Sequence, residues 1–294
     1  MKRKIIKQGV GGNTIFLPVK WVRENNLGPG DDVDIIEDGN SLTISGQAHK
    51  QKTKDAKIET DNINLIRSLI ASWYKTGYTE IRLRFKQVPD MQQVNRIINT
   101  FTGLEVVQQE SNSLTIRSFL STPPEEIESL IIKMFQITRL ITQTINESWE
   151  KTDLNTINSA KTNLLRLRDH CLRAIRIHKY AGETSFDLHE YVTTLEKISA
   201  EYHALATNIK EHKIKRTPML SESIGLIDEA YKTHLKKDFN SANSLWLKIG
   251  KMKRDKRLSS EKDKWAAMHL YRQVNLFRQL TSRQLNLCSQ IAGQ

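Results

Sequence analysis

Residues 15–36 read Ile15-Phe-Leu-Pro18-Val-Lys-Trp-Val-Arg-Glu-Asn-Asn-Leu-Gly28-Pro-Gly-Asp31-Asp-Val-Asp-Ile-Ile36, and this stretch decides the fold of the first part of the chain. An apolar run ends at Pro18, whose fixed φ suits the first turn of a helix. About two helical turns follow. Gly28 then stands where a left-handed C-terminal cap is expected, and Pro29 prevents continuation of the helix. The stretch therefore predicts a strand, a short helix and a second strand.

A hairpin is expected after this helix. Val33 and Ile35 alternate with polar residues, and Asp38-Gly39-Asn40 is a turn sequence typical of β-hairpins. Residues 1–46 (the head) are therefore expected to run strand, strand, short helix, strand, strand. A unit of this size buries too little surface to fold securely alone, so we expect it to pair with a second copy. The apolar positions that need cover are Ile15, Leu17, Val33 and Ile35.

The order of these signals resembles a known family. Leu17-Pro18 is followed by Trp21-Val22, by Leu27, by Pro29-Gly30-Asp31 and by Val33, as in the AbrB/SpoVT swapped-hairpin domain, especially its archaeal form. The resemblance implies an intertwined homodimer that contacts DNA through basic residues. The residues that it indicates are Lys2, Arg3, Lys4, Lys7 and Arg23. The alternative is that Lys2 to Lys4 form a solvated terminus without a ligand.

The composition is that of a globular protein with a basic excess. Of the 294 residues, 38% are hydrophobic and 27% are charged, and the formal net charge is +12. A basic balance is compatible with nucleic acid or with a phosphate-rich partner. No apolar run approaches the roughly 18 residues that span a bilayer, so we expect no membrane insertion. Cys171 and Cys288 lack metal-ligand spacing and are expected to be small buried side chains in a reducing cytoplasm.

The middle of the chain is a separate, mixed segment. Residues 47–57 are polar and lysine-rich without an apolar period, which predicts a linker. Residues 57–119 (the mixed region) then show helix, strand, helix, strand, strand. This order predicts a small α+β domain. Because it has no phosphate-binding glycine motif and no paired catalytic groups, we expect its role to be structural.

From residue 120 to 294 (the helical region) the sequence has helical periodicity with charged opposite faces. Thr122-Pro-Pro-Glu125 has the form of a capping box. Six helices, the last three shorter, predict an up-and-down array of two three-helix bundles. The expected fold class is therefore α+β: a small swapped-hairpin head, a small α+β middle domain and a mainly α array.

The helical region, with Leu195-Glu-Lys-Ile-Ser-Ala200, resembles the PhoU-like family of phosphate-uptake regulators, and an AbrB-like head on such a region is an arrangement seen in archaeal proteins. The resemblance implies a Glu/Asp-x-x-x-Asp pair that can hold metal ions. Here Glu196 matches the first position, but Ala200 stands at the second, and Asn155 and Asn158 replace a further acidic pair. We therefore expect no metal cluster and no cofactor, and we expect Glu196 to pair with a cation on an adjacent helix.

Basic side chains cluster in residues 166–179, 210–216 and 248–257. We expect them on the solvated faces of helices; the alternative is a surface for DNA or an acidic partner. Together these features predict a cytoplasmic, non-enzymatic DNA-binding homodimer. The resemblance implies control of phosphate uptake, with the helical region sensing a signal or docking a phosphate transporter or two-component regulatory protein. One alternative is a protein whose head only dimerises while the helical region docks a phosphate transport complex; another is a metal-dependent helical enzyme.

Overall fold

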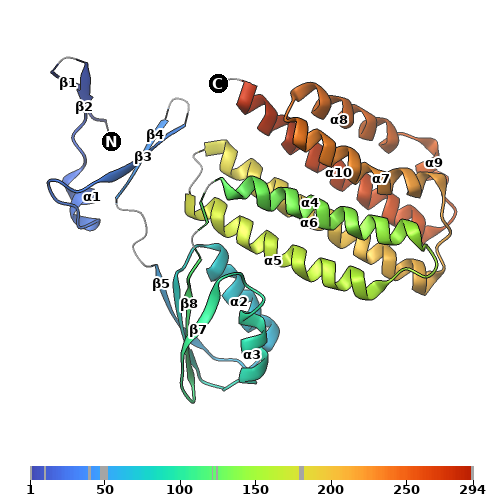
Figure 1. Ribbon diagram of the computed structural model, residues 1–294, viewed down its shortest axis with the longest axis horizontal. Coiled ribbons are helices and arrows are strands. Elements are labelled where there is room, and N and C mark those ends of the chain that lie inside the picture. Colours follow the sequence, from blue (N-terminus) through green and yellow to red (C-terminus); the bar gives the residue numbers. More distant parts are fainter. Residues whose placement is uncertain are drawn as a thin grey trace. The chain divides into compact units, whose positions relative to one another are not determined.

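The computed structural model describes residues 2–9, 11–38, 41–46, 52–120, 122–123, 125–178 and 182–292. The chain divides into two compact units, residues 1–50 and 51–294. The first contains the head, and the second contains the mixed and helical regions (Figure 1). The predicted α+β fold with a helical C-terminal region is confirmed.

The strand expected to end at Pro18 instead ends at Thr14, but the head has the predicted order of elements. These are β1 (Ile6–Gln8), β2 (Gly12–Thr14), α1 (Val19–Glu24), β3 (Val33–Asp38) and β4 (Ser41–Gly46). β1 pairs with β2 and β3 pairs with β4, both antiparallel, so the described strands of the head form two separate hairpins. Asp38 pairs with Ser41 across the second turn, whose Gly39 and Asn40 lie outside the described residues.

The end of α1 differs from the prediction. The left-handed residue is Asn26, with φ of 50°, and not Gly28. The Leu27 amide donates to Val22 O and the Asn26 amide donates to Arg23 O, both at 3.0 Å, which is the hydrogen-bond pattern of a Schellman motif. Asn tolerates this conformation, so α1 ends at Glu24 and its left-handed cap residue lies two positions before the glycine. The Gly28 amide instead donates to Asp31 Oδ2 at 2.7 Å, which closes the following turn.

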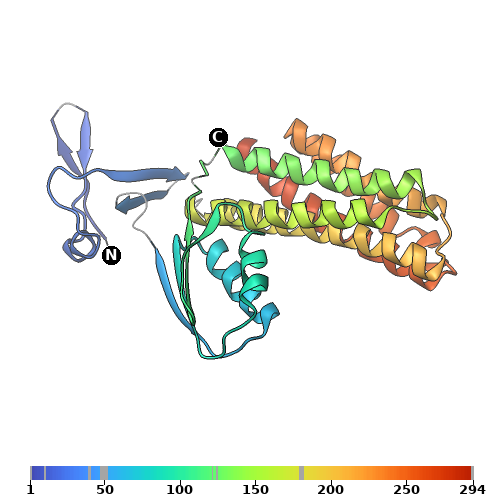
Figure 2. The same cartoon turned by 60° about the horizontal axis from the view of Figure 1, so that its bottom comes forward.

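The mixed region is a four-stranded sheet with two helices on one face (Figure 2). Its elements are β5 (Thr53–Ile58), α2 (Ile63–Lys75), β6 (Glu80–Phe85), α3 (Met91–Ile98), β7 (Leu104–Gln109) and β8 (Ser113–Ser118). The sheet order is β5-β6-β8-β7, with β5 parallel to β6 and the other pairs antiparallel. The core between sheet and helices includes Ile70, Tyr74, Leu83, Val94 and Ile116.

The linker predicted at residues 47–57 is wrong over its second half, because residues 53–57 belong to β5. Residues 47–51 lie outside the described part of the chain. β5 is an edge strand in which Lys54, Ala56 and Ile58 are the less exposed positions. The ammonium of Lys54 lies 5.8 Å from the centre of the Trp73 ring, so this lysine covers apolar surface while its charge reaches solvent. Lysines are common on edge strands, which is why their abundance did not exclude a strand here.

The helical region contains, within the described residues, six long helices in two sets of three. They are α4 (Glu126–Glu147), α5 (Leu154–His178) and α6 (Gly182–His212), then α7 (Pro218–Lys236), α8 (Phe239–Lys253) and α10 (Lys264–Ala292), with a single turn, α9 (Lys256–Ser259), before the last. The expectation that the last three are shorter is wrong for α10, which has 29 residues. Buried side chains from both sets form one continuous core, and the Tyr202 ring of α6 lies 6.4 Å from the Phe277 ring of α10.

The predicted capping box at Thr122 does not form. α4 begins after Glu125, and no side-chain hydrogen bond caps it. Thr122 Oγ1 lies instead 2.6 Å from His170 Nε2 of α5, and the Thr122 carbonyl contacts His178 Nε2 of the same helix. Thr122 therefore holds the connection between the mixed and helical regions against α5.

Candidate functional site

The basic residues predicted to contact DNA are all exposed. Lys2, Arg3 and Lys4 precede β1, Lys7 lies on β1, and Arg23 lies in the last turn of α1. Within the described residues none of the five forms an ion pair, whereas Lys20 of α1 lies 3.9 Å from Glu24. Five cations of the head are therefore not neutralised by any side chain that the structure describes.

The head also exposes large apolar side chains. Ile5 and Phe16 are each 71% exposed, and Val19, Ile35 and Leu42 are each close to 60% exposed. No described side chain of residues 2–46 is buried. Ile15 and Ile35 are exposed as predicted, while Leu17 and Val33 are half-buried. Phe16 and Val19 were missed, although an apolar pair flanking Leu17-Pro18 was a signal that could have identified them.

Glu196 of α6, the degenerate metal candidate, is held by an arginine. Arg168 Nη1 of α5 lies 3.5 Å from Glu196 Oε2, and Arg168 Nη2 lies 2.8 Å from Asp169 Oδ1. The prediction that Glu196 pairs with a cation on an adjacent helix is therefore confirmed. Asn158 Oδ1 lies 2.7 Å from His203 Nε2, so one of the two asparagines is also engaged.

A buried carboxylate that the sequence analysis missed follows directly after Ala200. Glu201 Oε1 lies 2.5 Å from His269 Nδ1 of α10, and His269 Nε2 lies 3.0 Å from Asn208 Nδ2. Glu196 and Glu201 are five residues apart, about 140° around the helix, so their carboxylates face different neighbours and do not share an ion. Glu201 lies three residues after Ile198 and four residues before Leu205, both in the core. This helical spacing could have revealed that Glu201 is buried.

Neither a metal centre nor a membrane span is found in the described part of the chain. No group of three or more His, Cys, Asp and Glu side chains there is arranged to hold a metal ion. None of the described helices combines the length and apolar character that crossing a bilayer requires.

Not all clustered basic side chains of the helical region are solvated. Arg173 of α5 is only 2% exposed, and Arg168 is largely shielded by its two carboxylates. Burial lowers the pKa of the Arg173 guanidinium. The expectation of a solvated face is therefore wrong for these two arginines, while Arg176, Arg254 and Arg257 are exposed.

The chain was compared with protein-family models and with curated proteins, and nothing in either set matches it.

Proposed function

We propose that the protein is a non-enzymatic, DNA-binding homodimer in which two heads pair and present Lys2, Arg3, Lys4, Lys7 and Arg23 to DNA. The observation that carries this proposal is the state of the head: its large apolar side chains lack cover, and these five cations form no ion pair within the described residues. The helical region would sense a signal or dock a partner. Control of phosphate uptake is the role that the family resemblance supports.

Pairing of the heads follows from the apolar exposure. Fully burying a side chain such as Phe16 or Ile35 contributes about 1.5–3 kcal/mol. In a two-fold pair each covered residue counts twice, because both copies contribute the same surface. Covering Ile5, Phe16, Val19, Ile35 and Leu42 in this way would offset the entropy lost on association, which is of order 4–15 kcal/mol.

DNA contact follows from the charge. A dimer would present two copies of the five exposed cations, and each phosphate that a cation neutralises releases condensed counterions. Binding of this kind depends strongly on salt and little on base sequence. The proposal therefore concerns the phosphate backbone and leaves the base sequence open.

Dimerisation is tested on the full-length chain by light scattering. Phe16→Ser should shift the protein from dimer toward monomer, whereas Phe239→Ser, at a 48%-exposed phenylalanine of α8, should leave the mass unchanged. A monomeric wild type, or a Phe16→Ser protein that dimerises as tightly as the wild type, would contradict the proposed pairing.

DNA binding is tested by fluorescence anisotropy of a labelled duplex over a salt titration. Replacing Lys2, Arg3 and Lys4 with Gln should weaken binding to all sequences and lower the log–log salt slope by about 0.9 for each lost phosphate contact. The control replaces the exposed Lys232, Lys236 and Arg176 of the helical region with Gln, an equal loss of charge. If the two triple variants behave alike, these head residues are a solvated terminus.

A dimer that retains no DNA would favour the alternative, a head that only dimerises and a helical region that docks a transport complex.

A further inference from the structure

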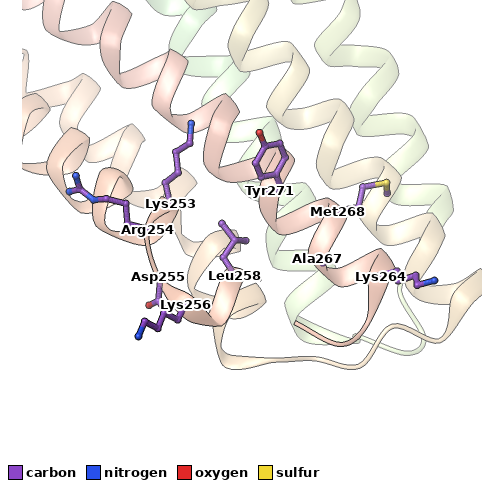
Figure 3. Close-up of a pocket in the computed structure, with 9 residues that line it drawn as sticks. All are labelled: Lys253, Arg254, Asp255, Lys256, Leu258, Lys264, Ala267, Met268 and Tyr271. Carbon is purple, nitrogen blue, oxygen red and sulfur yellow. The ribbon is translucent and has the colours of Figure 1, made fainter. Parts of the chain in front are cut away.

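A hollow of about 600 Å³ lies where α8 ends, α9 makes one turn and α10 begins. This volume is in the range of small-molecule sites, which is about 300–1,000 Å³. Residues from all three helices and their connections line it, as Figure 3 shows. The hollow is far along the sequence from the head, and nothing in the proposed DNA contact uses it.

The lining combines two kinds of side chain. Figure 3 shows Leu258 and Tyr271 projecting into the same space, with Lys253 on the side opposite Tyr271. The apolar part also includes Ala267 and Met268, and Tyr271 is 57% exposed. The basic part consists of Lys253, Arg254, Lys256 and Lys264, of which the last three extend outward at the edge of the hollow. The result is an apolar floor with cations around it.

The acidic residue of the lining does not cancel this charge. Asp255 accepts hydrogen bonds from Arg257 Nη2 at 2.7 Å and Arg257 Nε at 3.0 Å, and it caps α9 through the Arg257 amide. These bonds lower the pKa of the Asp255 carboxyl. Within the described residues, Lys253, Arg254 and Lys264 form no ion pair. The hollow therefore presents an excess of positive charge to whatever enters it.

We propose that this hollow binds a nucleoside polyphosphate, with the base against Tyr271 and Leu258 and the phosphates beside Lys253 and the neighbouring Arg254. A ligand with a single carboxylate would neutralise only one of the cations. Inorganic phosphate would leave the exposed tyrosine ring and its apolar neighbours uncovered. An aromatic base attached to several phosphates matches both parts of the lining, since bases stack on aromatic rings and phosphates form charge-assisted hydrogen bonds with Lys and Arg.

Isothermal titration calorimetry on the full-length protein tests this site, with ATP, tripolyphosphate and adenosine as separate probes. ATP should bind saturably with one site per chain, and more tightly than tripolyphosphate or adenosine. Lys253→Gln combined with Arg254→Gln should weaken ATP binding at least about tenfold, the effect of losing roughly one charge-assisted hydrogen bond. Tyr271→Ser should weaken ATP binding about fivefold or more and leave tripolyphosphate binding unchanged.

The matched control is Lys232→Gln combined with Arg176→Gln, which removes the same charges from exposed positions of α7 and α5 and should leave ATP binding unchanged. Lys253→Arg keeps the charge and should retain binding, which separates loss of charge from loss of fold. Any one of three results would overturn the proposal. The first is that ATP does not bind saturably, and the second is that the Lys253/Arg254 variant and the control variant bind ATP equally well. The third is that Tyr271→Ser does not change ATP binding. No DNA is present in this experiment, so its failure would leave the proposed function of the head intact.

Discussion

Replacing Arg173 with Met should loosen the attachment of the mixed region to the helical region. Arg173 Nη1 donates to the Tyr74 carbonyl at 2.7 Å and to the Tyr78 carbonyl at 2.8 Å, and its guanidinium carbon lies 4.9 Å from the centre of the Tyr74 ring. Both tyrosines belong to the end of α2 and the turn that follows it. One buried cation of α5 therefore bonds two carbonyls at the end of α2, of which the Tyr74 carbonyl also accepts from the Gly77 amide at 3.0 Å.

The magnitude follows from these contacts. A hydrogen bond from a charged donor contributes about 1.5–3 kcal/mol, and methionine removes two of them. Part of this loss is offset, because the substitution also removes a buried charge. The Nε of the Arg173 guanidinium is buried and has no hydrogen-bond partner within the described residues. Methionine fills most of the same volume, so little cavity is created. We expect a net loss of about 2–4 kcal/mol in the free energy of unfolding of the mixed region.

Urea unfolding, combined with hydrogen exchange of the α2 and β6 amides, measures this loss. Arg176→Met is the control, since it removes the same group from an exposed position one turn further along α5. Arg173→Lys should fall between the wild type and Arg173→Met, because a single ammonium replaces the planar donor pair. If Arg173→Met and Arg176→Met differ by less than about 0.5 kcal/mol, the contacts with Tyr74 and Tyr78 do not stabilise the attachment.

Three further results are expected. His234 lowers the pKa of the Glu128 carboxyl to about 2, so the advantage in urea stability of the wild type over Glu128→Gln should be full above pH 4.5 and should disappear as the pH falls toward 2. Burial raises the pKa of the Cys171 thiol to about 12, so a thiol-reactive dye should label Cys171 after unfolding and not before. Ala200→Asp alone should bind no stoichiometric manganese by elemental analysis, whereas Ala200→Asp with Arg168→Met should bind it, because the arginine no longer holds the glutamate four residues earlier.

Local sequence signals predicted the elements well, and nonlocal contacts account for the errors. Gly77 has φ of 88° and ends α2 with the Tyr78 amide donating to Trp73 O, and a glycine directly after an apolar helix is a sequence signal for such a left-handed cap. At α1 the same rule favoured Gly28 over Asn26, because glycine preference alone does not rank two nearby candidates. β5 was missed because its pairing with β6 is a long-range contact, and a lysine-rich alternation carries little apolar signal.

The candidate sites were predictable to a lesser degree, since they depend on neighbours from other elements. The engagement of Glu196 by a cation could be predicted from Ala200, because no second carboxylate stands four residues after Glu196 to share a metal ion with it. The identity of that cation could not, because it lies on another helix, 28 residues earlier in the chain. The hollow at the start of α10 could not be predicted from the basic residues of 248–257 alone, because it is formed by the packing of α8, α9 and α10.

The basic residues of α5 show why charge alone does not locate a binding surface. Arg173 and Arg176 lie within one turn of each other in a segment rich in basic residues, yet the first is buried against main-chain carbonyls and the second is exposed. A buried arginine contributes to the net charge of the chain without being available to a ligand. Only cations that remain exposed and unpaired after folding can attract phosphate. Lys2 to Lys4 of the head and Lys253 with Arg254 beside the hollow meet this condition within the described residues, and we therefore place the two proposed anion contacts there.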